Sequence, residues 1–160
     1  MRTGENGIKL MHYFESLRLE AYPDPATGGA PWTIGYGHTG SDVFKGLVIT
    51  KERAEELFAK RLESEFEPGV GDKLRRLPTQ NQFDAMVSLA YNVGVRNFQR
   101  STLLNMFNVG NFLGASDQFM SWTKAAGKEM LGLKRRRHAE RMVFDGYSAE
   151  AAIESAKEIK

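Results

Sequence analysis

The segment AYPDPATGGAPWTIGYGHTG, residues 21–40, sets this chain apart from an all-helical protein. It holds three of the five prolines and five of the sixteen glycines, and it also contains the short β-prone run Trp32-Thr33-Ile34 and Tyr36. Glycine and proline favour turns, whereas aromatic and β-branched residues favour strands. The segment therefore predicts a small, irregular sheet of two or three strands joined by glycine turns.

A helix is predicted on the N-terminal side of this segment, over residues 3–19. Leu10, Phe14 and Leu17 lie four and three positions apart, which is the spacing of one helix face. The helix carries several polar side chains between these positions, so one face is expected to pack against a core and the other to meet solvent.

Further helices are predicted after the segment. Thr50 is suited to cap a helix that runs to about Phe66, and Glu67-Pro-Gly-Val-Gly is expected to break it. Thr79-Gln-Asn-Gln82 has the form of a capping box and opens an apolar helix that Gly94 ends. The remaining helical patterns cover 101–109, 112–123, 133–144 and an Ala-rich tail that begins at Ser148.

The order of these elements predicts an α+β fold with a small N-terminal β lobe and a larger helical C-terminal lobe. At 160 residues, 41% of them hydrophobic, the chain is expected to form one catalytic domain over residues 1–160. The β lobe would span about residues 20–48, and the helical lobe about residues 1–19 and 50–160. A cleft between two such lobes is where an extended ligand is expected.

Composition excludes several kinds of site and leaves others open. The chain has no cysteine, which rules out disulfides, thiolate metal sites and a cysteine nucleophile. The net charge of +2 is compatible with a polyanionic partner but selects none. Neither an apolar signal-peptide core nor a bilayer-spanning segment is found, so no export signal and no stable membrane insertion are expected.

Two carboxylates near the predicted sheet are candidates for acid–base chemistry. Glu15 lies late on the first predicted helix beside Phe14 and Leu17, where partial burial would favour the protonated form that suits an acid. Asp24 lies in the following proline-rich turn and is expected to be wetter and ionised. Glycoside hydrolysis needs such a pair in unlike protonation states. Spacing alone is weak support, because a chain with twenty acids offers many pairs.

The residues around this pair carry a resemblance. The stretch FESLRLEAYPD (14–24), followed by WTIGYGH (32–38), closely resembles the active-site segment of the phage-type lysozymes, or endolysins, related to those of T-even and lambdoid phages (glycoside hydrolase family 24). QFDAMVSLAYNVG (82–94), STLL (101–104), FMSW (119–122) and GLKRRRHAE (132–140) follow in the family's order. The match covers roughly residues 5–145 and implies a lysozyme-like fold.

The resemblance implies roles for individual residues. Glu15 would be the general acid, Asp24 the second carboxylate, and Thr33 the hydroxyl that helps to hold the attacking water. The best-studied members invert at the anomeric carbon, which would make Asp24 a general base. Whether the anomeric configuration is inverted or retained depends on the distance between the two carboxyl groups.

A second group is expected to bind substrate or to support the site. Gly37 would permit a tight turn, and its backbone could also approach a sugar ring. His38 could pack behind the β lobe or contact substrate, and a zinc site is not expected, because the three histidines lack the spacing of a zinc motif. Asn92 could contact an N-acetyl group or cap its own helix, and one of Arg136 and Arg137 would reach the catalytic Glu.

Two departures from the family pattern concern the geometry of this site. Eight residues separate Asp24 from Thr33, where the family usually has about five, so Thr27 is a minor rival to Thr33. In some members an acid on the next helix pairs with the histidine of the Gly-x-Gly-His motif. The aligned position here carries Arg61, so that pair is either absent or rebuilt with another acid.

The resemblance implies an endolysin, a muramidase that hydrolyses the β-1,4 bond between N-acetylmuramic acid and N-acetylglucosamine of peptidoglycan without metal or cofactor. It would be a monomer that accumulates in the host cytoplasm and reaches the wall through a holin-permeabilised membrane. A lytic transglycosylase and a non-catalytic wall- or nucleic-acid-binding module are the rivals. Nucleic acid is not expected, because Glu129 and Glu140 flank the basic run at 134–137 and the net charge is small.

Overall fold

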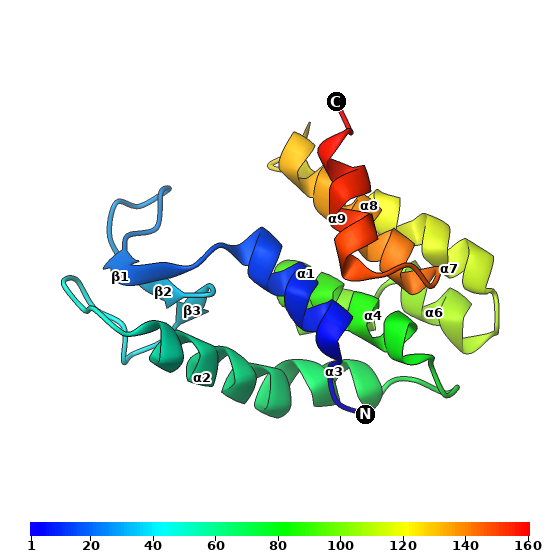
Figure 1. The fold of residues 1–160 in the computed structure, drawn as a ribbon, viewed down its shortest axis with the longest axis horizontal. Helices are drawn as coiled ribbons and strands as arrows, with labels where there is room; N and C mark the ends of the chain where they lie inside the picture. The colour runs from blue at the N-terminus through cyan, green and yellow to red at the C-terminus, as the bar shows by residue number, and fades with distance from the viewer. The chain divides into compact units, whose positions relative to one another are not determined.

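The computed structural model describes residues 1–160, and sixteen elements follow one another along the chain (Figure 1). They are α1 (Glu5–Glu15), β1 (Arg18–Tyr22), β2 (Thr33–Gly35), β3 (His38–Thr39), α2 (Lys51–Arg61), the π-helix η1 (Leu62–Phe66), α3 (Glu67–Gly71), α4 (Gln80–Val93), α5 (Val95–Gln99), α6 (Thr102–Asn108), α7 (Phe112–Gln118), the 3-10 helix η2 (Phe119–Ser121), β4 (Lys124–Ala125), β5 (Lys128–Glu129), α8 (Leu131–Phe144) and α9 (Ala149–Lys157). The expected α+β class is confirmed.

The chain divides into two compact units. We call residues 12–64 the sheet unit and residues 1–11 with 65–160 the helical unit. The sheet unit contains the antiparallel sheet β1-β2-β3, and α2 packs against β2. Ile34, Tyr36 and Phe58 are among its buried residues. Ile34 and Gly35 of β2 are buried, whereas the first three residues of β1 are exposed, so the core of this unit lies at the central strand and against α2.

The helical unit is built around α4. Eight consecutive residues of α4, from Phe83 to Ala90, are buried, and α8 packs against it. Figure 1 shows α9, in red, lying along α8, in orange. A helix that is buried on nearly every side is the centre of a helical core, which explains why this stretch has an almost continuous apolar sequence.

Three predicted helix starts are confirmed by their caps. The Thr50 side chain accepts a hydrogen bond from Arg53 N, and that of Ser148 accepts one from Ala151 N. The capping box at Thr79 is complete, because Thr79 Oγ1 accepts from Gln82 N and Thr79 N donates to Gln82 Oε1. Gly94 ends α4, with a φ of 99°.

Two predicted boundaries are wrong. The first helix does not continue to residue 19, because Ser16 adopts a φ of 56° and the chain then enters β1. Glu67-Pro-Gly-Val-Gly does not break the helical path, because these residues form α3. Pro68 lies in the first turn of that helix, where its missing N–H removes no hydrogen bond.

The N-terminus of α1 is capped from a distant part of the chain. Gly4 N donates to Asp84 Oδ1 at 2.8 Å, and Gly7 N donates to Asp84 Oδ2 at 3.1 Å. Asp84 is almost completely buried in α4. The carboxylate thus satisfies two free amides at the positive end of the helix and joins α1 to the core of the helical unit.

Candidate active site

Glu15 is the last residue of α1, and the turn that follows it is tight. Its side chain is partly buried. Ser16, with φ 56°, lies in the left-handed region that a non-glycine residue seldom adopts. Such strained residues persist where the surrounding structure holds them, often beside functional groups. The turn aims the chain from α1 into β1 directly after the carboxylate.

Asp24 lies at the other end of β1, two residues beyond Tyr22. Its Oδ1 atom accepts a hydrogen bond from Ala26 N at 2.7 Å, which forms an Asx turn. Its backbone N donates to Gly29 O at 2.9 Å. These bonds hold one carboxylate oxygen in place, and the other makes no hydrogen bond within the protein.

The long loop after Asp24 closes on itself. Asp24 O accepts from Gly28 N at 2.8 Å, and the Thr27 hydroxyl donates to Ala30 O and accepts from Gly29 N. Tyr22 and Thr33 remain register partners of β1 and β2 despite the insertion. The additional residues therefore form a bulge that leaves Thr33 paired with the strand that leads into Asp24.

The two threonines of this region differ in what their hydroxyls do. The Thr27 hydroxyl is engaged in the exposed loop. Thr33 is partly buried at the start of β2, between Tyr22 on one side and Thr39 on the other. Its hydroxyl makes no hydrogen bond within the protein, so it remains available to a water molecule or a substrate.

His38 pairs with an acid that the sequence analysis did not single out. His38 Nε2 lies 3.2 Å from each carboxylate oxygen of Asp42. The hydrogen bond with His38 is the main cause that lowers the pKa of Asp42. Of the two alternatives for the histidine pair, rebuilding with another acid is the one observed. Only the i, i+4 spacing in a loop could have indicated it.

Arg61 and Gly37 are joined by a backbone contact. Arg61 Nη1 donates to Gly37 O at 3.1 Å, and Gly37 adopts a φ of 82° in the turn between β2 and β3. The arginine thus supports the turn before His38.

His12 stacks on Tyr36 in the same unit, with ring centroids 4.1 Å apart, and burial is the main cause that lowers the pKa of His12.

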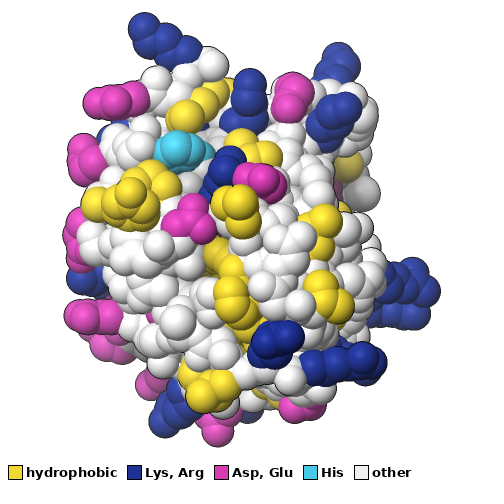
Figure 2. Space-filling view, turned by 90° about the vertical axis from the view of Figure 1, so that its right-hand side faces the viewer, with side chains coloured by type: hydrophobic (Ala, Val, Ile, Leu, Met, Phe, Trp, Pro, Cys, Tyr) yellow, Lys and Arg dark blue, Asp and Glu magenta, His cyan; other side chains and the backbone are white.

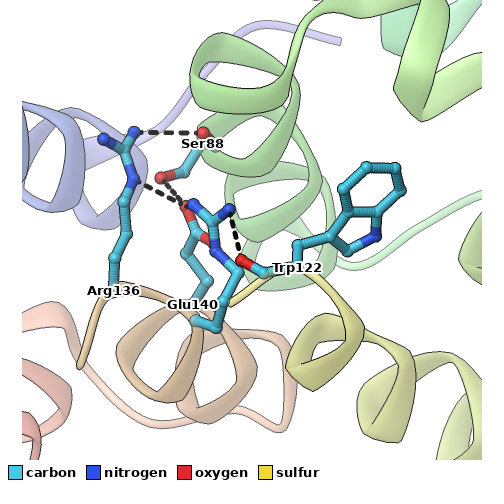
Figure 3. Close-up of polar contacts among 5 residues, drawn as sticks. Ser88, Trp122, Arg136 and Glu140 are labelled. Atoms are coloured by element: carbon cyan, nitrogen blue, oxygen red, sulfur yellow. Dashed lines mark hydrogen bonds and ion pairs between the residues drawn. The ribbon is translucent and has the colours of Figure 1, made fainter. Parts of the chain in front are cut away.

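The helical unit holds Arg136 and Arg137 in a buried cluster (Figure 3). Arg136 Nε donates to Glu140 Oε2 at 3.1 Å, and Arg136 Nη2 donates to Ser88 O at 3.1 Å. Arg137 Nε lies 2.7 Å from Glu140 Oε1, and Arg137 Nη1 donates to Trp122 O at 3.4 Å. The Ser88 hydroxyl also donates to Glu140 Oε2. The two arginines are predictable from the sequence motif, but no local pattern indicates Ser88.

A hollow of about 420 Å³ opens beside this cluster. Asn92 lines it, and the amide of Asn92 makes no hydrogen bond within the protein. The C-terminal end of α4 is capped by other residues than Asn92. Gly94 is the C-cap, and the Asn97 side chain donates a hydrogen bond to Val93 O. The other lining residues are polar, cationic or aromatic for the most part: Val93, Asn97, Ser121, Trp122, Lys124, Ala125, Leu133 and Arg137. Amides, cations and an indole suit a polar, partly anionic ligand.

Comparisons with known proteins give one consistent result. The model of the phage lysozyme family matches residues 12–140. The endolysin of Bacillus phage B103 is 44% identical over 158 residues, which are 98% of this chain and 59% of that protein. The SAR-endolysin of Enterobacteria phage P21 is 38% identical over 112 residues, 70% of this chain and 67% of that protein.

A solved structure extends the comparison to the fold. The endolysin from Escherichia coli O157:H7 phage FAHEc1 has a TM-score of 0.80 and 36% identity, covering 90% of this chain and 93% of that one. The expected lysozyme-like fold is thereby confirmed. The chain spans only 55–59% of the length of the Bacillus phage endolysins that it matches.

Proposed function

Because the chain belongs to the phage lysozyme family, we propose that it is an endolysin that hydrolyses the β-1,4 bond between N-acetylmuramic acid and N-acetylglucosamine in peptidoglycan. The observation that carries the proposal is the placement of two carboxylates at the two ends of β1. Glu15 precedes this strand and Asp24 follows it, while the free hydroxyl of Thr33 lies on the paired strand.

Glu15 is the proposed general acid, which protonates the glycosidic oxygen as the bond breaks. Asp24 is the proposed general base. One of its oxygens is fixed by Ala26 N, which leaves the other to take a proton from water. Thr33 would hold that water, because its hydroxyl can donate to one partner and accept from another. No metal or organic cofactor takes part in these steps.

Gly37 and His38 are proposed as support for the sheet that carries Thr33. The contact of Arg61 with Gly37 O fixes the backbone of the β2–β3 turn, and the contact with Asp42 holds the His38 ring. Asn92 is proposed to contact the wall polymer at the hollow on the helical unit, where its amide is free and Lys124 supplies an exposed cation. Arg136 and Arg137 are buried against Glu140 and are proposed to support this part of the site. We propose that residues 1–160 act as one catalytic domain.

A lytic transglycosylase is the second candidate, because it cleaves the same bond with an acid alone. The free oxygen of Asp24 and the free hydroxyl of Thr33 favour hydrolysis, since both suit a bound water and transglycosylation uses none. Mass spectrometry of the products from purified sacculi tests the choice. Reducing N-acetylmuramic acid ends would support hydrolysis, and 1,6-anhydro ends would overturn it.

We further propose that the protein acts as a monomer and reaches the wall from the host cytoplasm with the help of a holin. None of its helices combines the length and the apolar character needed to cross a bilayer. Expression in Escherichia coli with and without a holin tests the route. Lysis only in the presence of the holin would support it, whereas lysis by the chain alone would point to another route of export.

A further inference from the structure

The loop between α3 and α4 carries a surface that the proposed hydrolysis does not use. We call Lys73, Arg75, Arg76, Leu77 and Val109 the cationic–apolar patch. Two adjoining hollows connect these residues: one, of about 350 Å³, is lined by Arg75, Arg76 and Leu77, and the other, of about 570 Å³, by Lys73, Arg75 and Val109. All five lie on the helical unit.

The patch combines cations with unusually exposed aliphatic side chains. Leu77 is 88% exposed and Val109 is 73% exposed, which places them among the three most exposed large hydrophobic residues of the chain. Figure 2 shows basic and hydrophobic side chains close together on the lower part of one face, with acidic side chains at the edge below them. A single exposed leucine is ordinary, but clustering with cations is a feature of surfaces that bind a partner.

The cations of the patch have no acidic partner. Neither Lys73 nor Arg75 forms an ion pair, and Asp72 is the only carboxylate that lines either hollow. Arg76 Nε donates to the backbone of Asn108 at 3.0 Å, so its charge is not neutralised there. The loop therefore presents a local excess of positive charge on a chain whose net charge is only +2.

The loop is also held in one conformation. Arg75 N donates to Asn108 Oδ1 at 2.8 Å, and Asn108 Nδ2 donates to Lys73 O at 3.0 Å. A Cβ added at Gly110 would lie 3.0 Å from Arg76 Cζ, so the turn after α6 is packed closely against this arginine. A surface that is ordered before binding loses little conformational entropy when it binds.

We propose that the cationic–apolar patch binds the surface of an anionic lipid bilayer. The cations would meet the headgroup phosphates, and Leu77 and Val109 would enter the boundary between headgroups and acyl chains. A phosphate polymer would use the cations but would give the aliphatic side chains no apolar phase to enter. The exposed leucine therefore favours a bilayer over a polymer.

Vesicle sedimentation tests the proposal. We expect the protein to bind vesicles of equal phosphatidylglycerol and phosphatidylcholine, and to bind pure phosphatidylcholine much more weakly. Lys73→Gln with Arg75→Gln should lower partitioning about 25-fold, since each cation contributes about fivefold near an anionic surface. Leu77→Ser should lower it about tenfold or more. These side chains are exposed, so the variants are expected to fold.

Matched controls lie elsewhere on the surface. Lys60→Gln with Lys160→Gln removes the same charge from exposed positions, and Val48→Thr alters a valine that is 66% exposed. Neither control should change partitioning. No binding by the wild type, or loss through the charge variant without loss through Leu77→Ser, would overturn the proposal; the second result would indicate a purely electrostatic contact with phosphate groups, without insertion of the aliphatic side chains. The Glu15→Gln variant should bind vesicles normally, which separates this test from that of hydrolysis.

Discussion

Arg137 Nε lies 2.7 Å from Glu140 Oε1, and neither side chain is exposed to solvent. Glu140 also accepts a hydrogen bond from Arg136, so one carboxylate serves two buried guanidinium groups. A buried charge that loses its partner is costly, because neither water nor another ion replaces the contact. The stability of the helical unit is therefore expected to depend on this one carboxylate.

Glu140→Gln should lower the free energy of unfolding by about 3–5 kcal/mol, measured by urea denaturation. Glu154→Gln is the control, because the Glu154–Lys157 pair is exposed and should contribute less than about 1 kcal/mol. Similar losses in both variants would contradict a special role for the buried cluster.

Asp24→Asn should lower the rate of wall hydrolysis by several orders of magnitude, because an amide cannot take a proton from water. The amide oxygen can still accept from Ala26 N, so the Asx turn and the thermal midpoint should be unchanged. Glu20→Gln, on the exposed strand between the two acids, should retain activity. Wild-type turnover in Asp24→Asn would remove Asp24 from the mechanism.

Thr33→Val and Thr27→Val separate the two threonines. Valine fits a strand as well as threonine, so Thr33→Val should fold normally but lose about 10²-fold in rate through a misplaced water. Thr27→Val should keep its rate and lose a little stability, because two loop hydrogen bonds disappear. The reverse pattern in initial rates would assign the water to Thr27.

His12 gives the stability of the sheet unit a pH dependence. Burial lowers the pKa of His12 below its ordinary value, and the charge of Lys51 acts in the same direction, against that of Glu55. Between the folded and the ordinary pKa the unfolded chain binds more protons, so stability falls as the pH falls from about 6.5. His12→Phe keeps an aromatic ring against Tyr36. This variant should show a weaker dependence of the unfolding midpoint on pH between pH 7 and 5 than the wild type. An unchanged slope would contradict this assignment.

Helix starts were predictable because their signals are local. The side chains of Thr50, Thr79 and Ser148 each cap an amide three residues away, so both partners lie within one short stretch of sequence. The end of α1 was not predictable from spacing, because Leu17 continues the helical pattern. The strand that begins at Arg18 is stabilised by its pairing with Gly35, a partner seventeen residues away.

The hairpin β4–β5 was missed for a related reason. Each strand has two residues, and the turn between them contains Ala126, which adopts a φ of 51°, and Gly127. The candidate site divides in the same way. Glu15 and Thr33 are predictable because they belong to recognisable motifs, whereas Asp42 and Ser88 belong to the site through contacts that carry no motif.

The central claim is that Glu15 donates the proton that breaks the glycosidic bond. The direct measurement is the release of reducing ends from purified sacculi by the wild type and by Glu15→Gln, with Glu20→Gln as the matched control and the thermal midpoint recorded for each. We predict rapid release by the wild type and the control, and almost none by Glu15→Gln at an unchanged midpoint. Comparable release by folded Glu15→Gln would contradict the account.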